Sequence, residues 1–335
     1  MRVLLFVHTY REKNGIASHV QNLARSMPKG VQCEVISGGA FSLPFFSGLK
    51  FPLSETWKAL ASDFDVMHIH GYGNFFSFFG AIVAALKGKP LVWTVHGYPR
   101  IIGARRLFYY VYRYLMAPFI FWKACRIISV SHDAKKLLEK ETAKRIEMMP
   151  NGVDLRLFRP GQPYRKQKYA AYVGRLDPDK GVMRMLECSS LPILFIGPDE
   201  GGTKEKLRAE AKRLGRHATF EEVPLERMPS AYEKCRYVIL PSKYEGFPMT
   251  LLESVAMERP FISTDVGEVK ATLAALFGRP EKFILQGSLQ QKISQLEKED
   301  LSSEMKSARK KAEKYSWGSI AARMAAIYRE CAGKK

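Results

Sequence analysis

Two glutamates bracket the segment YEGFPMTLLESVAMERP, which covers residues 244–260. Glu245 lies in a loop-like stretch, and Glu253 follows eight positions later, after a glycine, an aromatic residue and a proline. Proline is tolerated in the first turn of a helix, so Pro248 predicts a helix through MTLLESVAME whose first N–H groups would face an anion. Glu253 would lie about one and a half turns inside that helix. Carboxylates held apart in this way suit two sets of ligand hydroxyls; the alternative for Glu253 is a solvated helix face.

Two cations stand close together in VGRLDPDKG (173–181). Arg175 and Lys180 are five residues apart, across a turn that Asp177 and Pro178 mark. Such a turn can fold both side chains onto one anion, and a forked guanidinium beside a point-charge ammonium suits a diphosphate. The alternative is a pair of solvated loop cations. A diphosphate flanked by two groups of hydroxyls is the plan of a nucleotide sugar, which makes this ligand class the leading hypothesis.

Histidines gather near predicted strand ends and helix starts, at positions 8, 19, 68, 70, 96 and 132. His96 ends the strand-like run LVWTVH, where it could be either a ligand contact or a satisfied core residue. His68 and His70 alternate on one strand, so one is expected to be buried and one exposed. The spacings match no zinc pattern. Because two cations can neutralise a diphosphate, the sequence predicts no metal, and no cofactor beyond the nucleotide sugar substrate.

Length and composition indicate two globular domains. The chain has 335 residues and 46% hydrophobic residues, which is too long for one ordinary core and too apolar for disorder. Its five cysteines are far apart, so we expect reduced thiols in a cytosolic protein. The start, MRVLLFVHTY, resembles a buried strand more than a signal peptide. No run reaches the ~18 apolar residues of a membrane span.

Short apolar runs alternate with helical patterns, which is typical of parallel sheets with crossover helices. The predicted strands are residues 3–7, 33–37, 66–70, 91–96 and 126–131, then 169–176, 193–197, 218–223, 237–242 and 260–265. Two prolines and two glycines in residues 150–161 predict a linker. We therefore expect two α/β domains, at 1–160 and 161–315, and a last amphipathic helix within 316–335. Ligands bind beyond the carboxyl ends of such strands.

Positive charge is unevenly distributed in the chain, whose formal net charge is +20. No acidic residue lies between Asp65 and Asp133, an interval that holds many aromatic residues and several basic ones. A basic, aromatic surface can attract nucleic acid, an anionic bilayer or a phosphorylated acceptor. The alternative is an ordinary solvated face. The residues predicted to form this acceptor or membrane surface are Arg100, Arg105, Arg106 and Arg113.

Taken in order, these motifs resemble those of the retaining glycosyltransferases of family 4, the group 1 glycosyl transferases. The resemblance runs nearly end to end, through Gly15, HIHG (68–71), TVHG (94–97), SVS (129–131), NGVD (151–154), VGRL…KG (173–181) and the E-x7-E pair in PSKYEGFPMTLLES (241–254). It implies the GT-B fold, with two Rossmann-like α/β/α domains whose parallel sheets face a central cleft. The first domain would bind the acceptor and the second the donor, and the helix around Trp317 would cross back to the first domain.

The resemblance also implies roles for single residues. The catalytic set is His96 beside the sugar, Arg175 and Lys180 on the leaving diphosphate, and Glu245 on sugar hydroxyls. Glu253 would bond the ribose, and Gly15 would let backbone approach the phosphates. The donor-binding set is Gly15, Gly174, Val223, Gly246, Phe247, Pro248, Met249 and Glu253. The sequence departs from the family pattern at Asn14 and at Glu268, where glycines are commoner.

The predicted function is transfer of a hexose, with retention and without a metal, from a UDP- or GDP-linked donor to a lipid-linked or membrane-proximal glycan. The predicted partners are the nucleotide sugar, that glycan and an anionic membrane surface. The predicted location is the cytoplasm, at the inner face of the membrane. One alternative is a nucleotide-sugar epimerase on the same fold. Another is a non-catalytic subunit that binds a sugar nucleotide or a lipid carrier. Nucleic-acid binding is suggested by charge alone, since the chain carries no recognisable module for it.

Overall fold

The structure is a computed structural model that describes residues 1–10, 15–38, 41–42, 50–98, 105–199 and 201–333. Contacts divide the chain into a first unit, Met1–Gly152 with Trp317–Lys335, and a second unit, Val153–Ser316. The sequence predicted a domain boundary between residues 160 and 161, whereas the second unit begins at Val153. The Val153 N–H donates to the carbonyl of Tyr315, which also belongs to the second unit, at 2.9 Å. The C-terminal helix belongs to the first unit.

The first unit is built on a six-stranded parallel sheet with the order β2-β1-β5-β6-β7-β8. Its strands are β1 (Arg2–Val7), β2 (Gln32–Ser37), β5 (Val66–His70), β6 (Leu91–Val95), β7 (Ala124–Ser129) and β8 (Ile146–Met148). The first five were predicted from their apolar runs, and the three-residue β8 was not. A short antiparallel pair is formed by β3 (Phe41–Ser42) and β4 (Lys50–Phe51).

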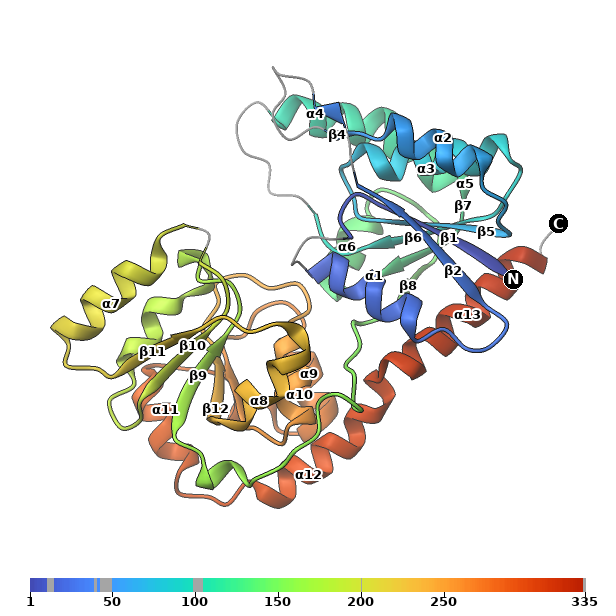
Figure 1. The fold of residues 1–335 in the computed structure, drawn as a ribbon. Helices are drawn as coiled ribbons and strands as arrows, with labels where there is room; N and C mark the ends of the chain where they lie inside the picture. Colours follow the sequence, from blue (N-terminus) through green and yellow to red (C-terminus); the bar gives the residue numbers. More distant parts are fainter. Residues whose placement is uncertain (11–14, 39–40, 43–49, 99–104, 200, 334–335) are drawn as a thin grey trace. The chain divides into compact units, whose positions relative to one another are not determined.

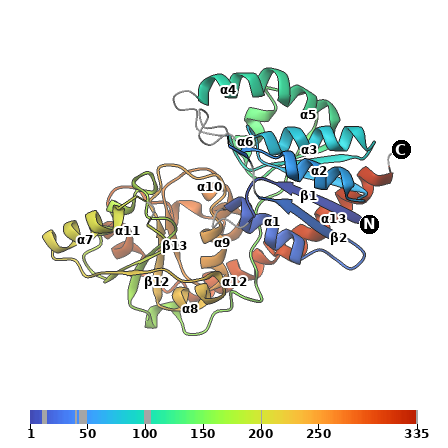
Figure 2. The same cartoon turned by 45° about the horizontal axis from the view of Figure 1, so that its top comes forward.

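Helices cover both faces of this sheet. Figures 1 and 2 show α2, α3 and α5 on one face and α1 and α13 on the other. The helices of the first unit are α1 (Gly15–Arg25), α2 (Leu53–Ala61), α3 (Phe75–Leu86), α4 (Arg105–Val111), the π-helical turn η1 (Tyr112–Met116), α5 (Ala117–Lys123), α6 (His132–Leu138) and α13 (Trp317–Gly333).

The apolar run at 75–86 forms α3, a core helix of the first unit. It begins at Asn74, whose side-chain oxygen accepts from the Ser77 N–H at 2.8 Å and caps the helix. The helix packs against α2, α5 and β5, which explains why it is apolar on almost every side. Among the described residues, no helix has both the length and the apolar character needed to cross a membrane.

A disulfide joins the sheet of the first unit to its C-terminal helix. It links Cys125 of β7 to Cys331 of α13, with Cα atoms 6.0 Å apart. The expectation of five reduced cysteines is wrong for this pair. The two residues are 206 positions apart, so only the return of α13 to the sheet brings them together. Cys33, Cys188 and Cys235 are free thiols, as expected.

Breaking this disulfide should lower the stability of the protein. The crosslink restricts the unfolded chain, so reduction or Cys331→Ser should lower the free energy of unfolding by roughly 2–4 kcal/mol in chemical denaturation. Thiol titration of the unfolded, unreduced protein should find three reactive thiols among the five cysteines. Cys33→Ser, which changes a free thiol, is the control and should leave the effect of reductant intact. A count of five thiols would contradict the prediction.

The second unit contains a five-stranded parallel sheet with the order β11-β10-β9-β12-β13. Its strands are β9 (Tyr169–Val173), β10 (Ile193–Ile196), β11 (Ala218–Glu221), β12 (Cys235–Leu240) and β13 (Phe261–Ser263), and all five were predicted. Because β9 lies in the centre, the loops after β9 and β12 leave the sheet at neighbouring points. Those loops carry the two charged motifs of the sequence.

Helices also surround the second sheet. They are the 3-10 turns η2 (Tyr164–Lys166), η3 (Pro178–Lys180), η4 (Val182–Glu187), η5 (Leu225–Arg227), η6 (Pro280–Lys282) and η7 (Ala312–Tyr315), and the helices α7 (Thr203–Arg213), α8 (Met228–Glu233), α9 (Met249–Ala256), α10 (Val269–Phe277), α11 (Leu289–Leu296) and α12 (Ser302–Lys311). Helix α12 packs against α9 and α10, and α7 lies beside β11 (Figure 1). Two parallel-sheet α/β domains are thus confirmed.

Candidate functional site

A charged pair lies where β9 and β12 of the second unit end. Lys180 is the last residue of η3, and its Nζ donates to Glu245 Oε1 at 2.8 Å. Ser242 Oγ donates to the same oxygen at 2.7 Å. Both charged side chains are partly exposed, 25% for Lys180 and 13% for Glu245. The ammonium and the carboxylate therefore meet at one edge of the sheet while staying open to a ligand.

Arg175 begins the loop that leads from β9 to Lys180. Its carbonyl accepts from the buried Tyr172 hydroxyl at 2.7 Å, which fixes the start of the loop. Gly174 has φ +148°, and a Cβ there would come within 2.8 Å of that hydroxyl. A cavity of about 210 Å³ lies beside the loop. It is lined by Arg175, Leu176, Asp177, Pro178, Gly201 and Thr203.

The loop after β12 leads directly into α9. Pro248 is the residue before the helix, as expected for a proline at a helix start, and no side chain among the described residues caps this end. Gly267, with φ +52°, lies so close to the loop that a Cβ would come 2.2 Å from the Glu245 carbonyl oxygen. The Glu268 N–H donates to the Gly246 carbonyl at 3.0 Å. These main-chain contacts fix the loop that leads from Glu245 to the start of α9.

Glu253 lies inside α9 and is buried. Its Oε2 accepts from the Tyr232 hydroxyl at 2.7 Å, and the residue is 9% exposed. Burial raises the pKa of this carboxyl above its ordinary value, and the tyrosine hydrogen bond offsets part of that rise. The alternative of a solvated helix face is therefore excluded. A buried carboxylate of this kind gains from a further hydroxyl donor.

Replacing Glu253 by glutamine should raise stability at neutral pH. A carboxyl whose folded pKa exceeds its unfolded pKa stabilises the fold only when protonated, and this contribution is lost as pH rises through the folded pKa. Glu253→Gln should thus raise the free energy of unfolding by about 1 kcal/mol at pH 7.5 and give no gain near pH 4. Urea unfolding at both pH values checks this. Glu226→Gln, at an exposed position, is the control; a gain independent of pH would contradict the prediction.

The other residues predicted to bind a donor are distributed over both units. Val223 follows β11 and packs, half-buried, against the core of the second unit, as does Phe247. Met249 begins α9. Gly15 is the first residue of α1 in the first unit, and a Cβ there would meet nothing within 4 Å. Its predicted approach to phosphates stays a prediction.

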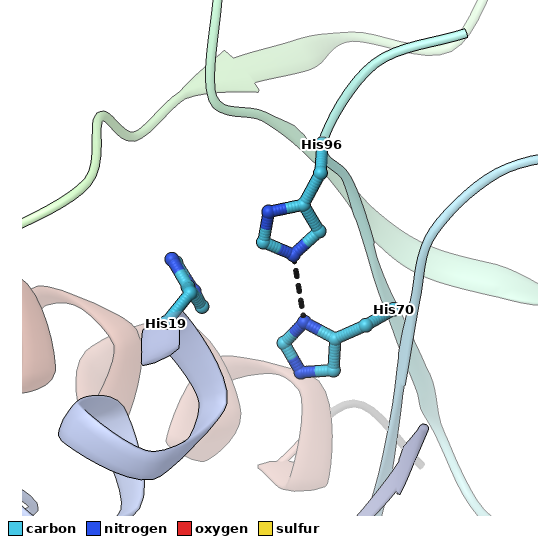
Figure 3. A group of neighbouring side chains, drawn as sticks. All are labelled: His19, His70 and His96. Atoms are coloured by element: carbon cyan, nitrogen blue, oxygen red, sulfur yellow. Dashed lines mark hydrogen bonds between the residues drawn. The ribbon is translucent and has the colours of Figure 1, made fainter. Parts of the chain in front are cut away.

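His96 follows β6 in the first unit and lies among other histidines. Its Nε2 is 3.2 Å from His70 Nδ1, and its ring is 4.7 Å from that of His19, centre to centre (Figure 3). Burial lowers the pKa of His70 and His96 well below the ordinary value, and lowers the pKa of His19 to about 4. These imidazoles are therefore neutral near pH 7.

His68 and His70 are both buried, so the expectation that one would be exposed is wrong. The reason is that helices cover both faces of the sheet, and α13 packs over this strand. His68 Nδ1 lies 2.6 Å from the Tyr328 hydroxyl of α13, and its Nε2 lies 2.8 Å from Thr94 Oγ1. His68 is thus a satisfied core residue.

The basic residues predicted to form an acceptor or membrane surface are only partly described. Arg100 lies outside the described residues, and Arg105 begins α4. Arg106 is exposed, 5.8 Å from the centre of the Tyr110 ring. Arg113 contacts the Glu141 carboxylate at 3.3 Å, so part of its charge is used within the fold. Large apolar side chains are exposed nearby in η1 and α5: Tyr114, Leu115 and Trp122.

Several contacts of these sites had no sequence signal. Asn151 Oδ1 lies 2.8 Å from His19 Nδ1, although 132 residues separate them. Tyr232 reaches Glu253 from α8, and Gly181 approaches the Pro241 carbonyl. For the approach of Gly181 to Pro241 the sequence offered a hint, since a glycine follows Lys180 and glycine is favoured where φ is positive. The partners themselves are set by tertiary structure.

Two protein-family models match the chain, one after the other. Residues 13–157 match the family model described as Glycosyltransferase Family 4, and residues 155–315 match Glycosyl transferases group 1. The chain is similar to an uncharacterized glycosyltransferase, MJ1178, of Methanocaldococcus jannaschii, with 24% identity over 80% of this chain and 80% of that protein. It is also 26% identical to the Escherichia coli UDP-Gal:alpha-D-GlcNAc-diphosphoundecaprenol alpha-1,3-galactosyltransferase, over 64% of this chain and 61% of that one.

Solved structures show the same fold. The crystal structure of Anabaena HepE in complex with UDP matches with a TM-score of 0.76 at 15% identity, over 98% of this chain and 100% of that one. A glycosyltransferase from Rickettsia africae matches with a TM-score of 0.76 at 16% identity, over 100% of this chain and 99% of that one. At these identities the likeness shows the fold alone. With both family models matched in order along one chain of GT-B fold, the protein belongs to the group 1 glycosyltransferases of family 4 and is a glycosyltransferase.

Proposed function

We propose that this glycosyltransferase transfers a hexose, with retention and without a metal, from a UDP- or GDP-linked donor to a lipid-linked or membrane-proximal glycan. The observation that carries the proposal is the Lys180–Glu245 pair, held at 2.8 Å, whose glutamate lies in the loop that leads to α9; the start of that helix has no side-chain cap among the described residues. A cation, a carboxylate that would accept from sugar hydroxyls and the positive end of a helix, all in the loops at this sheet edge, support the proposal.

Arg175 and Lys180 would bind the diphosphate as it leaves. Breaking the bond from the sugar carbon to the phosphate oxygen places negative charge on the leaving group. Cations and helix N–H groups that are already in place stabilise that charge where it develops. The same two residues would take the part that a metal has in other transferases, so chelator should leave the activity intact. Gly174 would give the loop room to approach the ligand.

Glu245 would accept hydrogen bonds from sugar hydroxyls, with the main-chain N–H groups of Gly246, Phe247 and Met249 beside it and Pro248 setting the start of the helix. Glu253 would accept from the ribose hydroxyls, in addition to Tyr232. Supporting this, its buried carboxylate has one hydrogen bond from Tyr232 and capacity for more. Val223 would lie near the base and Gly15 near the phosphates. His96, neutral near pH 7, would contact the sugar.

Retention is proposed through attack on the same face as the departing diphosphate. A double displacement would need a carboxylate free to attack the sugar carbon. Glu245 already accepts from Lys180 and Ser242, which lowers its reactivity as a nucleophile. An oxocarbenium-like state with front-face attack therefore fits the residues better. Nuclear magnetic resonance of the product made from an α-linked donor checks retention itself, because inversion would give the β anomer, whereas front-face attack and double displacement would both give the α anomer.

The acceptor part of the proposal rests on the relatives and on the first unit. Some relatives are named as acting on diphosphopolyprenol-linked sugars with UDP-galactose or GDP-mannose. The exposed Tyr114, Leu115 and Trp122, with Arg106 in the preceding helix, would contact an anionic membrane at its cytoplasmic face. Vesicles with anionic lipid should pellet the protein at low salt. Equal pelleting with neutral vesicles would remove the membrane part.

A calorimetric screen of UDP, GDP and ADP sugars tests the donor part. One nucleotide sugar should bind and should raise the melting temperature, and the same compound should be consumed when a polyprenyl-diphosphate sugar is supplied. Chelator should leave this consumption unchanged. If no nucleotide sugar of the three classes binds, the donor assignment fails.

A further inference from the structure

Three histidine rings converge in the first unit, from three separate elements. His19 lies on α1, His70 ends β5 and His96 follows β6 (Figure 3). Each ring offers one nitrogen, and the three nitrogens lie within 4.8 Å of one another. His19 and His70 are buried, with 1% and 0% exposed, and His96 is half-buried. The group is therefore enclosed by protein and reachable beside His96.

The orientation of His19 is fixed by an amide. Its Nδ1 lies 2.8 Å from Asn151 Oδ1, an oxygen that only accepts hydrogen bonds. Nδ1 therefore carries the proton and Nε2 keeps its lone pair, for which the described residues provide no hydrogen-bond partner. Histidines that bind metals typically donate their other N–H to an oxygen in this way. The contact with Asn151 thus prepares His19 to act as a ligand.

The spacing of His70 and His96 already fits a metal. In a tetrahedral site with metal–nitrogen bonds of about 2.0–2.1 Å, two ligand nitrogens are about 3.3 Å apart. His70 Nδ1 and His96 Nε2 are 3.2 Å apart. Without a metal, one of these two nitrogens carries a proton and donates a hydrogen bond to the other. His19 offers a third nitrogen, which lies within 4.8 Å of a nitrogen of each of the other two rings.

The composition of the group points to one class of ion. Among the described residues, the cluster contains imidazoles alone and no carboxylate. Neutral imidazoles suit zinc, copper and nickel, whereas magnesium and calcium prefer oxygen ligands. The neighbouring His68 is excluded as a fourth ligand, because Tyr328 and Thr94 occupy both of its nitrogens. A site with three histidines would leave one position for water or an anion.

We infer that His19, His70 and His96 form a binding site for a divalent ion of the zinc class. Binding would take the Nε2 lone pair of His96. The ion would thereby inhibit sugar transfer, a consequence that rests on the proposed contact of His96 with the donor sugar. The proposed transfer uses Arg175 and Lys180 in place of a metal, so the site would regulate the enzyme and would not supply a catalytic ion.

Titration of the tag-free, full-length protein with cobalt(II) tests the site directly, after treatment with chelator. One equivalent should bind, with the visible bands of four-coordinate cobalt and without the charge-transfer band of a thiolate ligand, which separates the site from the free cysteines. Zinc should displace the cobalt, and magnesium should not. His19→Ala should weaken binding at least about 100-fold, since a ligand contributes more than the 10- to 100-fold of a second-sphere partner.

Asn151→Ala provides a second variant that keeps all three ligands, and it should weaken binding about 10- to 100-fold. His217→Ala, an exposed histidine of the second unit, is the control and should bind as the unchanged protein does. Absence of stoichiometric cobalt binding, or equal binding by folded His19→Ala, would overturn the inference. The cobalt titration contains no sugar donor, so its result can be interpreted even if the proposed transferase activity is wrong. Zinc inhibition of transfer, weakened by Asn151→Ala, then tests the consequence.

Discussion

A Lys180→Ala enzyme should turn over its donor about 10²- to 10³-fold more slowly, and kcat should fall by a larger factor than the affinity for the donor. The ammonium lies at the edge of the second sheet, 2.8 Å from Glu245, where the diphosphate is proposed to leave. Removing one preorganised group that stabilises developing charge lowers kcat by about this factor. Steady-state kinetics with the donor found in the calorimetric screen measure both kcat and KM.

The matched control is Lys243→Ala, in the loop after β12. The Lys243 side chain is exposed, and its main-chain N–H donates to the Asp179 carbonyl at 3.1 Å, a contact that alanine keeps. The net charge of the two variants is the same, so a general electrostatic effect would appear in both. We expect kcat of Lys243→Ala to stay within a few-fold of the unchanged enzyme. Full turnover by Lys180→Ala would contradict the assignment of the diphosphate site.

Gly181→Ala should destabilise the second unit by about 3 kcal/mol or more. Gly181 follows Lys180 with φ +65°, a conformation that costs alanine about 1 kcal/mol. In addition, a Cβ would lie 2.0 Å from the Pro241 carbonyl oxygen, which is main chain and cannot move aside alone. The loop after β9 would then separate from the end of β12. Lys180 would leave Glu245, so activity should fall together with stability.

Gly215→Ala isolates the close approach from the backbone effect. Gly215 has φ +63°, and a Cβ there would meet nothing within 4 Å. Both substitutions therefore have the same free-energy cost for a positive φ, and only Gly181→Ala adds a clash with the Pro241 carbonyl oxygen. Urea unfolding should show a loss of about 1 kcal/mol for Gly215→Ala and a clearly larger loss for Gly181→Ala. Equal losses would show that the contact with Pro241 contributes nothing.

Local patterns predicted the elements of this protein well. Each strand of the second sheet, and five of the first, followed from short apolar or β-branched runs. The central strands β5 and β6 are buried on both faces and leave little room for polar residues, whereas the edge strands β2 and β11 are only partly buried. Pro248 correctly marked the start of α9, although it lies just before the first helical turn and not within it. The three-residue β8 was missed because so short a strand has no periodicity to detect. The domain boundary was placed late because a proline- and glycine-rich segment does not show which side it packs against.

By itself, the sequence determined the α/β class, the two units and the family. These follow from local composition and from the order of the motifs, and both can be read along the chain without its three-dimensional structure. Tertiary structure alone decided the burial of Glu253, the disulfide between Cys125 and Cys331, and the meeting of His19, His70 and His96. Those contacts join residues far apart in the chain. Their distances depend on how helices return to a sheet, and no spacing along the sequence records that.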